Sequence, residues 1–179
     1  MSNPINGYAL VKGPSVCPAT EQELKDFLRL DDESCGGLQI YLESAKDAVI
    51  AYLGTALLEQ EYTIVFNGYP FNGTATYGLS RDTAFLQDWV KLPYAKLMEL
   101  VSVEVIDEEN NIQIVDPSDY YTDEFSSPAR IRFGEGFPAT YDFERLKITY
   151  KAGYGTDTED VPLAIRLGIL QVAGYSTRS

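Results

Sequence analysis

The segment from Lys147 to Leu170 constrains the fold more than any other part of the sequence, because it leads from a strand pattern directly to a helix pattern. Its first residues alternate and are rich in β-branched and aromatic side chains, which is typical of a β-strand. A polar stretch follows, in which Asp160 has a position suited to an N-cap and Pro162 falls in the first helical turn. Apolar residues then recur at helical spacing: Ile165, Ile169, Val172 and Ala173. This last helix needs other helices against which to bury its apolar face, and the best candidates lie near the N-terminus.

Two amphipathic helices are predicted in the first third of the chain. Thr20 and Glu23 form a capping-box pattern, which predicts a short helix ending near Leu30. A longer helix follows, with Gly54 in the position of its C-cap. Its predicted buried face consists of Leu38, Tyr41, Leu42, Ala45, Val49, Tyr52 and Leu53. Residues 1–18 carry only scattered apolar side chains and are predicted to form an extended arm rather than a packed element.

Between residues 59 and 159 the period of the apolar residues changes from that of a helix to that of a strand. Alternating patterns predict short strands at residues 62–66, 100–106, 112–115, 120–121, 131–133 and 146–150. A polar turn at residues 107–111 predicts a hairpin. We therefore predict an α+β fold, in which an antiparallel β subdomain is inserted into a small helical domain. The predicted boundaries are 1–18 for the arm, 19–58 and 160–179 for the helical domain, and 59–159 for the β subdomain.

The composition argues against several classes of function. The formal net charge is −13, from 27 acidic and 14 basic residues, and such a surface repels nucleic-acid phosphates. The chain contains no histidine, which is the usual general base at neutral pH and the commonest metal ligand. Cys17 and Cys35 have no zinc-site spacing and are interpreted as small buried apolar residues.

No motif in the sequence predicts an enzyme, a cofactor or a metal site. Residues 134–139 fit the G-x-G-x-x-A pattern, but Pro138 blocks the helix that would have to bind a pyrophosphate. The acidic turns at 107–111 and 157–160 lack the order of an EF-hand loop and are interpreted as solvated turns. No apolar stretch is long enough to span a membrane, and no signal peptide is evident, so we expect a soluble protein made in the cytoplasm.

Tyrosine is unusually frequent, with 13 residues in the chain. Several of them fall in predicted loops or at strand ends: Tyr69, Tyr77, Tyr120, Tyr121 and Tyr154. An amphipathic aromatic ring at such a position suits a protein interface, but it suits cross-strand packing equally well. The sequence leaves both interpretations open.

A series of short motifs occurs in an order that is characteristic as a whole, although each motif alone is weak. The motifs are Thr20–Leu30, Ala45–Leu57, Leu92-Pro93, Leu97–Val103, Asp119-Tyr120-Tyr121, Pro128–Ile131, Phe137-Pro138, Thr149–Gly155 and Val161-Pro162 followed by Ile165. In this order and spacing the sequence resembles the head–tail connector (adaptor) proteins of long-tailed bacteriophages, the gp6-like group and its gp8-like relatives. It departs from that family at Ala95 and Lys96, near which a second proline is usual, and at Phe137, which replaces a common tryptophan.

The resemblance implies a structural virion protein that works without a cofactor. Such proteins form a closed ring, usually of twelve copies, that contacts the portal on one face. The other face receives a head-completion (stopper) or tail terminator protein, and DNA passes through the centre without sequence-specific contact. The implied location is the virion neck, with the host cytoplasm as the place of assembly.

Candidate contact residues follow from this resemblance. The expected portal-facing residues are Val161, Pro162, Ile165, Ile169, Tyr175 and Arg178. The tyrosines Tyr69, Tyr77, Tyr120, Tyr121 and Tyr154 are expected to contact neighbouring subunits or the tail side. The alternative function is that of a β-rich binding module, which would use the same tyrosines to bind a glycan or a host receptor.

Overall fold

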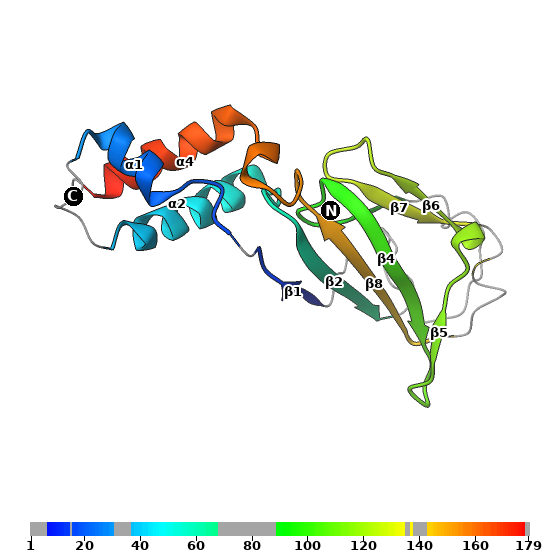
Figure 1. The fold of residues 1–179 in the computed structure, drawn as a ribbon. Coiled ribbons are helices and arrows are strands. Elements are labelled where there is room, and N and C mark those ends of the chain that lie inside the picture. The colour runs from blue at the N-terminus through cyan, green and yellow to red at the C-terminus, as the bar shows by residue number, and fades with distance from the viewer. Residues whose placement is uncertain are drawn as a thin grey trace.

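The computed structural model of the chain describes residues 7–14, 16–30, 37–67, 89–134, 137 and 143–177. Figure 1 shows an elongated molecule with its helices gathered at one end and its strands at the other. After a first strand the chain forms two helices, crosses to the remaining strands and returns to the helical end. The predicted α+β fold class is therefore confirmed.

Within the described residues, the helical region is formed by α1 (Glu21–Leu28), α2 (Leu38–Leu53) and α4 (Leu163–Ser176). The capping box predicted at the start of α1 is complete, because Thr20 and Glu23 bond to each other's backbone N–H groups. The predicted C-cap of α2 is also confirmed, since Gly54 has a left-handed φ of 61°. Helix α4 packs against both α1 and α2.

The predicted N-cap of α4 is wrong, because a short 3-10 turn precedes the helix. Its N-cap is Pro162, and Asp160 belongs instead to a 3-10 turn, Thr158–Asp160, that precedes the helix. The Asp160 carboxylate accepts a hydrogen bond from the backbone N–H of Asp157 at 3.0 Å. Asp160 thus closes this turn, and the short extended link through Val161 and Pro162 separates it from α4.

The helices enclose a small core to which all of them contribute. Its buried residues are Ala19, Leu24, Leu38, Leu42, Ala45, Leu57, Leu58, Val161, Ile169 and Ala173. Cys17 packs partly buried against this core, and burial raises the pKa of its thiol, as expected for a small apolar residue. Cys35 lies outside the described residues.

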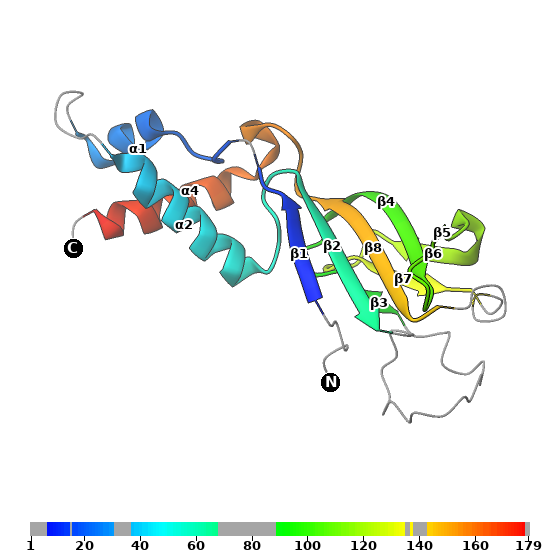
Figure 2. The same cartoon turned by 90° about the horizontal axis from the view of Figure 1, so that it is seen from below.

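The predicted buried face of α2 is only partly correct. Leu38, Leu42 and Ala45 are buried, but Tyr52 is 90% exposed. Tyr41 and Leu53 are exposed as well. Tyr52 and Leu53 belong to the last turn of α2, and Figure 2 shows that α2 crosses α4 and that this turn extends away from the other helices.

The β region contains β1 (Gly7–Lys12), β2 (Gln60–Asn67), β3 (Val90–Lys91), β4 (Leu97–Ile106), β5 (Ile112–Ile114), β6 (Tyr120–Asp123), β7 (Arg130–Phe133) and β8 (Arg145–Ala152). In the described part of the chain these strands form a five-stranded sheet, β1-β2-β8-β4-β5, and a three-stranded sheet, β3-β7-β6. All neighbouring strands are antiparallel, and the predicted hairpin is the pair β4–β5. Apolar side chains of both sheets form one core, which includes Ile64, Phe66, Ile131, Phe137 and Ile148.

The N-terminal arm contains an element that the sequence did not predict. Residues 7–12 form β1, which pairs with β2 at the edge of the five-stranded sheet. All six residues are exposed, so β1 is held by backbone hydrogen bonds rather than by burial of its side chains. A hydrophobic pattern gives little signal for such an edge strand.

The helical and β regions are joined by two chain segments that lie side by side. One leads from α2 to β2, and the other leads from β8 back to α4. The N–H of Glu59 donates to the carbonyl of Gly155 at 2.8 Å, and the N–H of Tyr154 donates to the carbonyl of Leu57 at 3.0 Å. These bonds fasten the outgoing and returning segments to each other.

Gly153 is the point of closest approach between the two segments. Its φ is 150°, and a Cβ atom at this position would lie 2.6 Å from the carbonyl of Leu58. Its own N–H donates to the carbonyl of Lys96 at 3.0 Å, which brings the segment before β4 into the same junction. Only glycine meets both the conformational and the steric requirement here.

An ion pair connects α1 to α4 on the surface of the helical region. The guanidinium of Arg166 contacts the Glu23 carboxylate and also donates to the carbonyl of Pro18 at 3.1 Å. Burial alone would raise the pKa of Glu23, but hydrogen bonds from Thr20 and the charge of Arg166 outweigh it and lower the pKa. The pair therefore favours the ionised carboxylate in the folded state.

Among the described residues, no helix is long and apolar enough to cross a membrane.

Replacing Gly153 with alanine should destabilise the protein by about 2–3 kcal/mol, because the new Cβ meets the Leu58 backbone at a disfavoured φ. Gly168 is the matched control, since it lies within α4 and a Cβ there meets nothing within 4 Å. Gly168→Ala should stabilise the protein by about 0.5–1 kcal/mol. Urea unfolding of the two variants measures both changes, and an equal effect of both would contradict the assigned role of Gly153.

Replacing Glu23 with glutamine should lower the Tm at pH 7, and this deficit should shrink as the pH falls below about 4.3. The folded-state pKa of Glu23 is lowered, so its contribution exists above the unfolded pKa and is lost as the pH falls through the folded value. Thermal unfolding between pH 7 and pH 3 tests this dependence. Glu108→Gln is the control, because Glu108 is exposed and has no ion pair within the described residues.

Candidate functional site

The described residues contain no group of three or more His, Cys, Asp or Glu side chains that could hold a metal ion. The carboxylates with lowered pKa values serve local structure instead. Burial would raise the pKa of Glu104, but Ser102 and Lys147 bond to it and lower the value. Hydrogen bonds from Ser126 and Arg130 lower the pKa of Asp123. The candidate site is therefore a surface that can contact another molecule.

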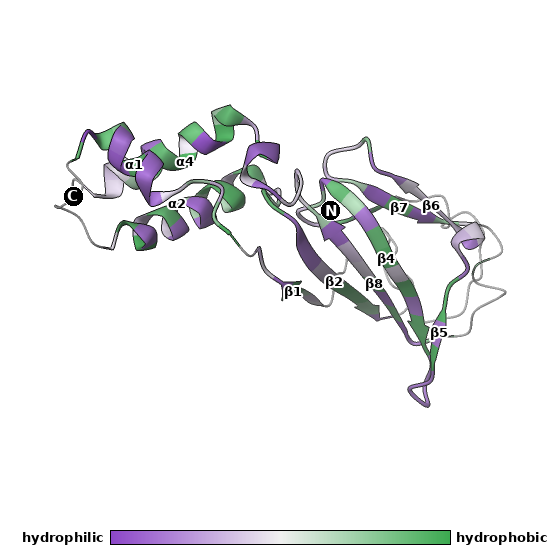
Figure 3. Ribbon diagram, viewed as in Figure 1, coloured by the Kyte–Doolittle hydropathy of each residue, from purple (hydrophilic) through white to green (hydrophobic). Residues whose placement is uncertain are grey.

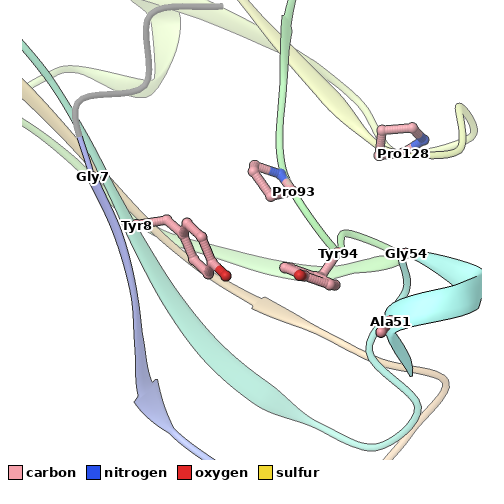
Figure 4. A pocket seen from close by; sticks show the side chains of 7 residues that line it. All are labelled: Gly7, Tyr8, Ala51, Gly54, Pro93, Tyr94 and Pro128. Carbon is pink, nitrogen blue, oxygen red and sulfur yellow. The ribbon is translucent and has the colours of Figure 1, made fainter. Parts of the chain in front are cut away.

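A groove of about 490 Å³ opens at the junction of the helical and β regions. Figure 4 shows it between the end of α2, the beginning of β1 and the turn that precedes β4. It is lined by Gly7, Tyr8, Ala51, Gly54, Pro93, Tyr94 and Pro128. Its walls therefore come from four segments that are far apart in the sequence, and they are almost entirely apolar.

Four tyrosine rings extend from this groove into the β core. Tyr8 lies against Tyr94, with ring centroids 5.9 Å apart. Tyr94 stacks on Tyr62 at 5.6 Å, and Tyr62 stacks on Tyr150 at 5.8 Å. Burial raises the pKa of Tyr62 to about 12, and a hydrogen bond with Tyr8 raises the pKa of Tyr94. Tyr62 and Tyr94 therefore keep their hydroxyl protons at physiological pH.

The turn that carries Pro93 and Tyr94 is held rigidly. The hydroxyl of Tyr150 donates to the carbonyl of Pro93 at 2.7 Å, and the N–H of Ala56 donates to the carbonyl of Tyr94 at 3.1 Å. Tyr94 has a φ of 56°, a left-handed conformation that is uncommon for a residue with an aromatic side chain. The groove is thus a preformed surface suited to an apolar or aromatic side chain.

The residues that were predicted to face the portal differ in how deeply they are buried. Val161 and Ile169 are fully buried in the helical core, and Ile165 is partly buried, so they support α4 from inside. Pro162 is exposed and Tyr175 is 78% exposed, while Arg178 lies outside the described residues.

Sequence reasoning missed the exposed apolar residues of α4. Leu163 is 76% exposed, and Leu167 and Val172 are also exposed, although Val172 was predicted to be buried. We refer to these residues together with Tyr175 as the exposed face of α4, although they lie on more than one side of the helix. Figure 3 shows hydrophobic residues along the length of this helix, whose one charged residue is Arg166. A helix that is apolar nearly all round gives no sequence signal for which side is buried.

The five predicted contact tyrosines also have different environments. Tyr120 packs against the β core, and Tyr154 packs against the helical core with the Lys96 ammonium 4.1 Å from its ring centroid. These two therefore take part in packing. Tyr121 is 55% exposed and remains a candidate for an interface. Tyr69 and Tyr77 lie outside the described residues.

No family model matches the sequence, and no curated protein matches it. Solved structures do share its fold. A chain in the neck of an empty gene transfer agent (GTA) particle, computed with C6 symmetry, is 16% identical, with a TM-score of 0.73 over 97% of this chain and 84% of that chain. A chain in the virion of the native GTA particle gives 16% identity and a TM-score of 0.72 over 96% and 84%. A chain in the neck of the native particle, computed with C12 symmetry, gives 16% and 0.70 over 97% and 84%.

This chain has the fold of a GTA neck chain. The likeness covers the helical region and the β region together, and therefore also the junction that positions them. At 16% identity the shared property is the fold.

Replacing Tyr150 with phenylalanine should destabilise the protein by about 1–2 kcal/mol, because the carbonyl of Pro93 loses its hydrogen-bond donor. Tyr121→Phe is the matched control, since Tyr121 is exposed and should change stability by less than about 0.5 kcal/mol. Chemical unfolding of both variants gives the comparison. Equal stabilities would mean that the Tyr150 hydroxyl does not secure the turn.

Proposed function

We propose that this chain is a structural protein of a virion neck, a head–tail connector that assembles into a ring. The supporting observation is the fold likeness to a GTA neck chain over 97% of the sequence. The neighbouring neck structures were computed with C6 and C12 symmetry, which supports a ring of twelve copies. A head-to-tail contact that closes after a full turn produces such a ring.

In this proposal the ring lies between the portal protein and the next neck or tail protein, a stopper or a tail terminator. The exposed face of α4 supports a partner at the helical end, because exposed apolar surface marks sites of protein contact. We assign the portal contact to this end. Pro162 and Tyr175 are the exposed members of the set predicted to face the portal. The β region, inserted as residues 59–159 between the helical segments 19–58 and 160–179, would then contact neighbouring copies and the tail side.

DNA passes through the proposed ring without being bound in a sequence-specific way. The net charge of −13 supports this role, because an anionic surface does not hold phosphate groups. The protein acts in the virion neck after assembly in the host cytoplasm, and the proposal requires neither a catalytic residue nor a cofactor.

The alternative proposal is a β-rich binding module for a glycan or a host receptor. The groove beside Tyr8 and Tyr94 favours it, since aromatic rings can stack on a sugar. Tyr120 and Tyr154, two of the tyrosines on which it was based, pack partly buried against the cores of this chain, which weakens the support for this alternative. Glycan binding by a stable monomer would support this alternative over a connector.

Particles complemented with the double variant Leu163→Asp/Tyr175→Asp should accumulate as DNA-filled heads and separate tails that are not joined. Both residues are more than 70% exposed, so the two charges should disrupt a contact at the face of α4 while leaving the Tm nearly unchanged. Electron microscopy of complemented particles counts joined and unjoined heads. Ser44→Asp is the control, because it adds a charge at an exposed polar position of α2.

Two results would contradict different parts of this proposal. Normal joining of heads by the double variant would remove the assignment of α4 to the portal contact. Images of wild-type particles with no copies at the vertex between capsid and tail would overturn the proposed function itself.

A further inference from the structure

One face of the three-stranded sheet β3-β7-β6 is buried, and the other carries cations and aromatic rings. Ile131 and Phe133 of β7 point into the β core, so the alternate residues of that strand lie on the opposite face. The strand register brings their neighbours on β3 and β6 to the same face. We call this surface the basic–aromatic face, and it consists of Trp89, Lys91, Tyr121, Asp123, Arg130 and Arg132.

The arginines of the basic–aromatic face are held in place by the aromatic rings. The guanidinium carbon of Arg130 lies 4.7 Å from the ring centroid of Trp89, and that of Arg132 lies 5.2 Å from it. Arg132 also lies 5.3 Å from the ring of Tyr121. Stacked arginines have already lost much of their rotamer freedom, so an incoming anion orders them at little further cost.

The charges of this face are only partly paired within the chain. Arg130 forms an ion pair with Asp123 at 2.8 Å. Arg132 and Lys91 have no carboxylate partner within the described part of the chain. A surface of three cations and one carboxylate is unusual on a chain whose net charge is −13. It therefore suits an anionic partner.

The turn between β4 and β5 of the same chain carries acidic side chains that are complementary to this face. Asp107 accepts hydrogen bonds from the backbone N–H of Asn111 at 2.8 Å and from its side-chain amide at 2.9 Å, which fixes the turn. Glu108 and Glu109 are exposed and have no ion-pair partner within the described residues. In the other acidic turn, by contrast, Asp160 already accepts a hydrogen bond from its own backbone.

We propose that the β4–β5 turn of one copy docks on the basic–aromatic face of the next copy. This contact rests on the proposed ring function and specifies how neighbouring copies recognise each other. Figure 1 shows the β4–β5 turn at the lower tip of the β region, well separated from the strands β6 and β7. Two different, complementary surfaces of this kind produce a head-to-tail contact, which is the type that closes into a ring. Glu108 and Glu109 pair with Arg132 and Lys91 across it.

Charge reversal on each side tests the contact. Arg132→Glu on the face, or Glu109→Lys on the turn, should weaken self-association about tenfold or more, because like charges then oppose each other. Sedimentation velocity over a range of concentrations at low salt measures the association. Lys91→Glu serves as a second face variant, since Lys91 is exposed and stacks on no ring. Glu159→Lys, a reversal in the other acidic turn, should leave association unchanged.

Combining the reversals gives the most specific result. The double variant Arg132→Glu/Glu109→Lys should regain association, because the reversed turn of one copy meets the reversed face of the next. An equimolar mixture of the two single variants should also associate. Each contact in that mixture joins unlike copies, so closed assemblies should contain an even number of chains.

Other outcomes overturn the contact in distinguishable ways. If the wild-type chain associates but the reversals have no effect, the contact is wrong and the proposed function stands. If the wild-type chain shows no concentration-dependent association, both the contact and the ring are wrong. If the face variants associate normally but lose binding to a labelled DNA duplex, the face is a DNA-contacting surface and the contact between copies is wrong.

Discussion

The arrangement of this molecule depends on the backbone contact between Gly153 and Leu58. At this point the segment returning from β8 passes so close to the segment entering β2 that no Cβ atom fits between them. Hydrogen bonds on both sides, from Glu59 to Gly155 and from Tyr154 to Leu57, extend the contact into a short backbone ladder. Because this ladder lies between two separate cores, it fixes the orientation of the helices relative to the sheets. The groove lies at the same junction, where α2, β1, the Pro93–Tyr94 turn and Pro128 meet.

The features that were predictable from the sequence are those with a local cause. The capping box of Thr20 and Glu23 depends on a spacing of three residues, and the β4–β5 hairpin depends on a polar turn between alternating segments. The features that were not predictable have a cause elsewhere in the chain. Strand β1 carries no burial pattern because it pairs with the edge of β2 and all of its residues are exposed. Tyr8 and Tyr94 lie 86 positions apart in the sequence and become neighbours only when β1 takes its place beside β2.

Helix α4 illustrates why a correct helix prediction can still misplace a surface. Its sequence is apolar on nearly every side, so periodicity identifies the helix but not the direction in which it is buried. The structure shows that Ile169 and Ala173 face the core, whereas Leu163 and Tyr175 face outward. An apolar side chain on the exposed side gains little stability from burial in the isolated chain. Its presence is explained if a second molecule covers it, and in the proposed ring that molecule is the portal.

The net charge places a physical condition on any ring built from this chain. Neighbouring copies that each carry −13 repel one another, and at physiological ionic strength this repulsion acts over about 8 Å, the distance that matters at a contact. Apolar burial between copies has to overcome it unless the charges at the contact itself are complementary. The basic–aromatic face provides three of the chain's 14 basic residues in one place, and the β4–β5 turn, at a separate tip of the β region, provides two glutamates that have no ion-pair partner among the described residues. A contact between them removes the repulsion where the copies are closest, while the remaining acidic surface stays free to keep DNA from adhering to the central channel.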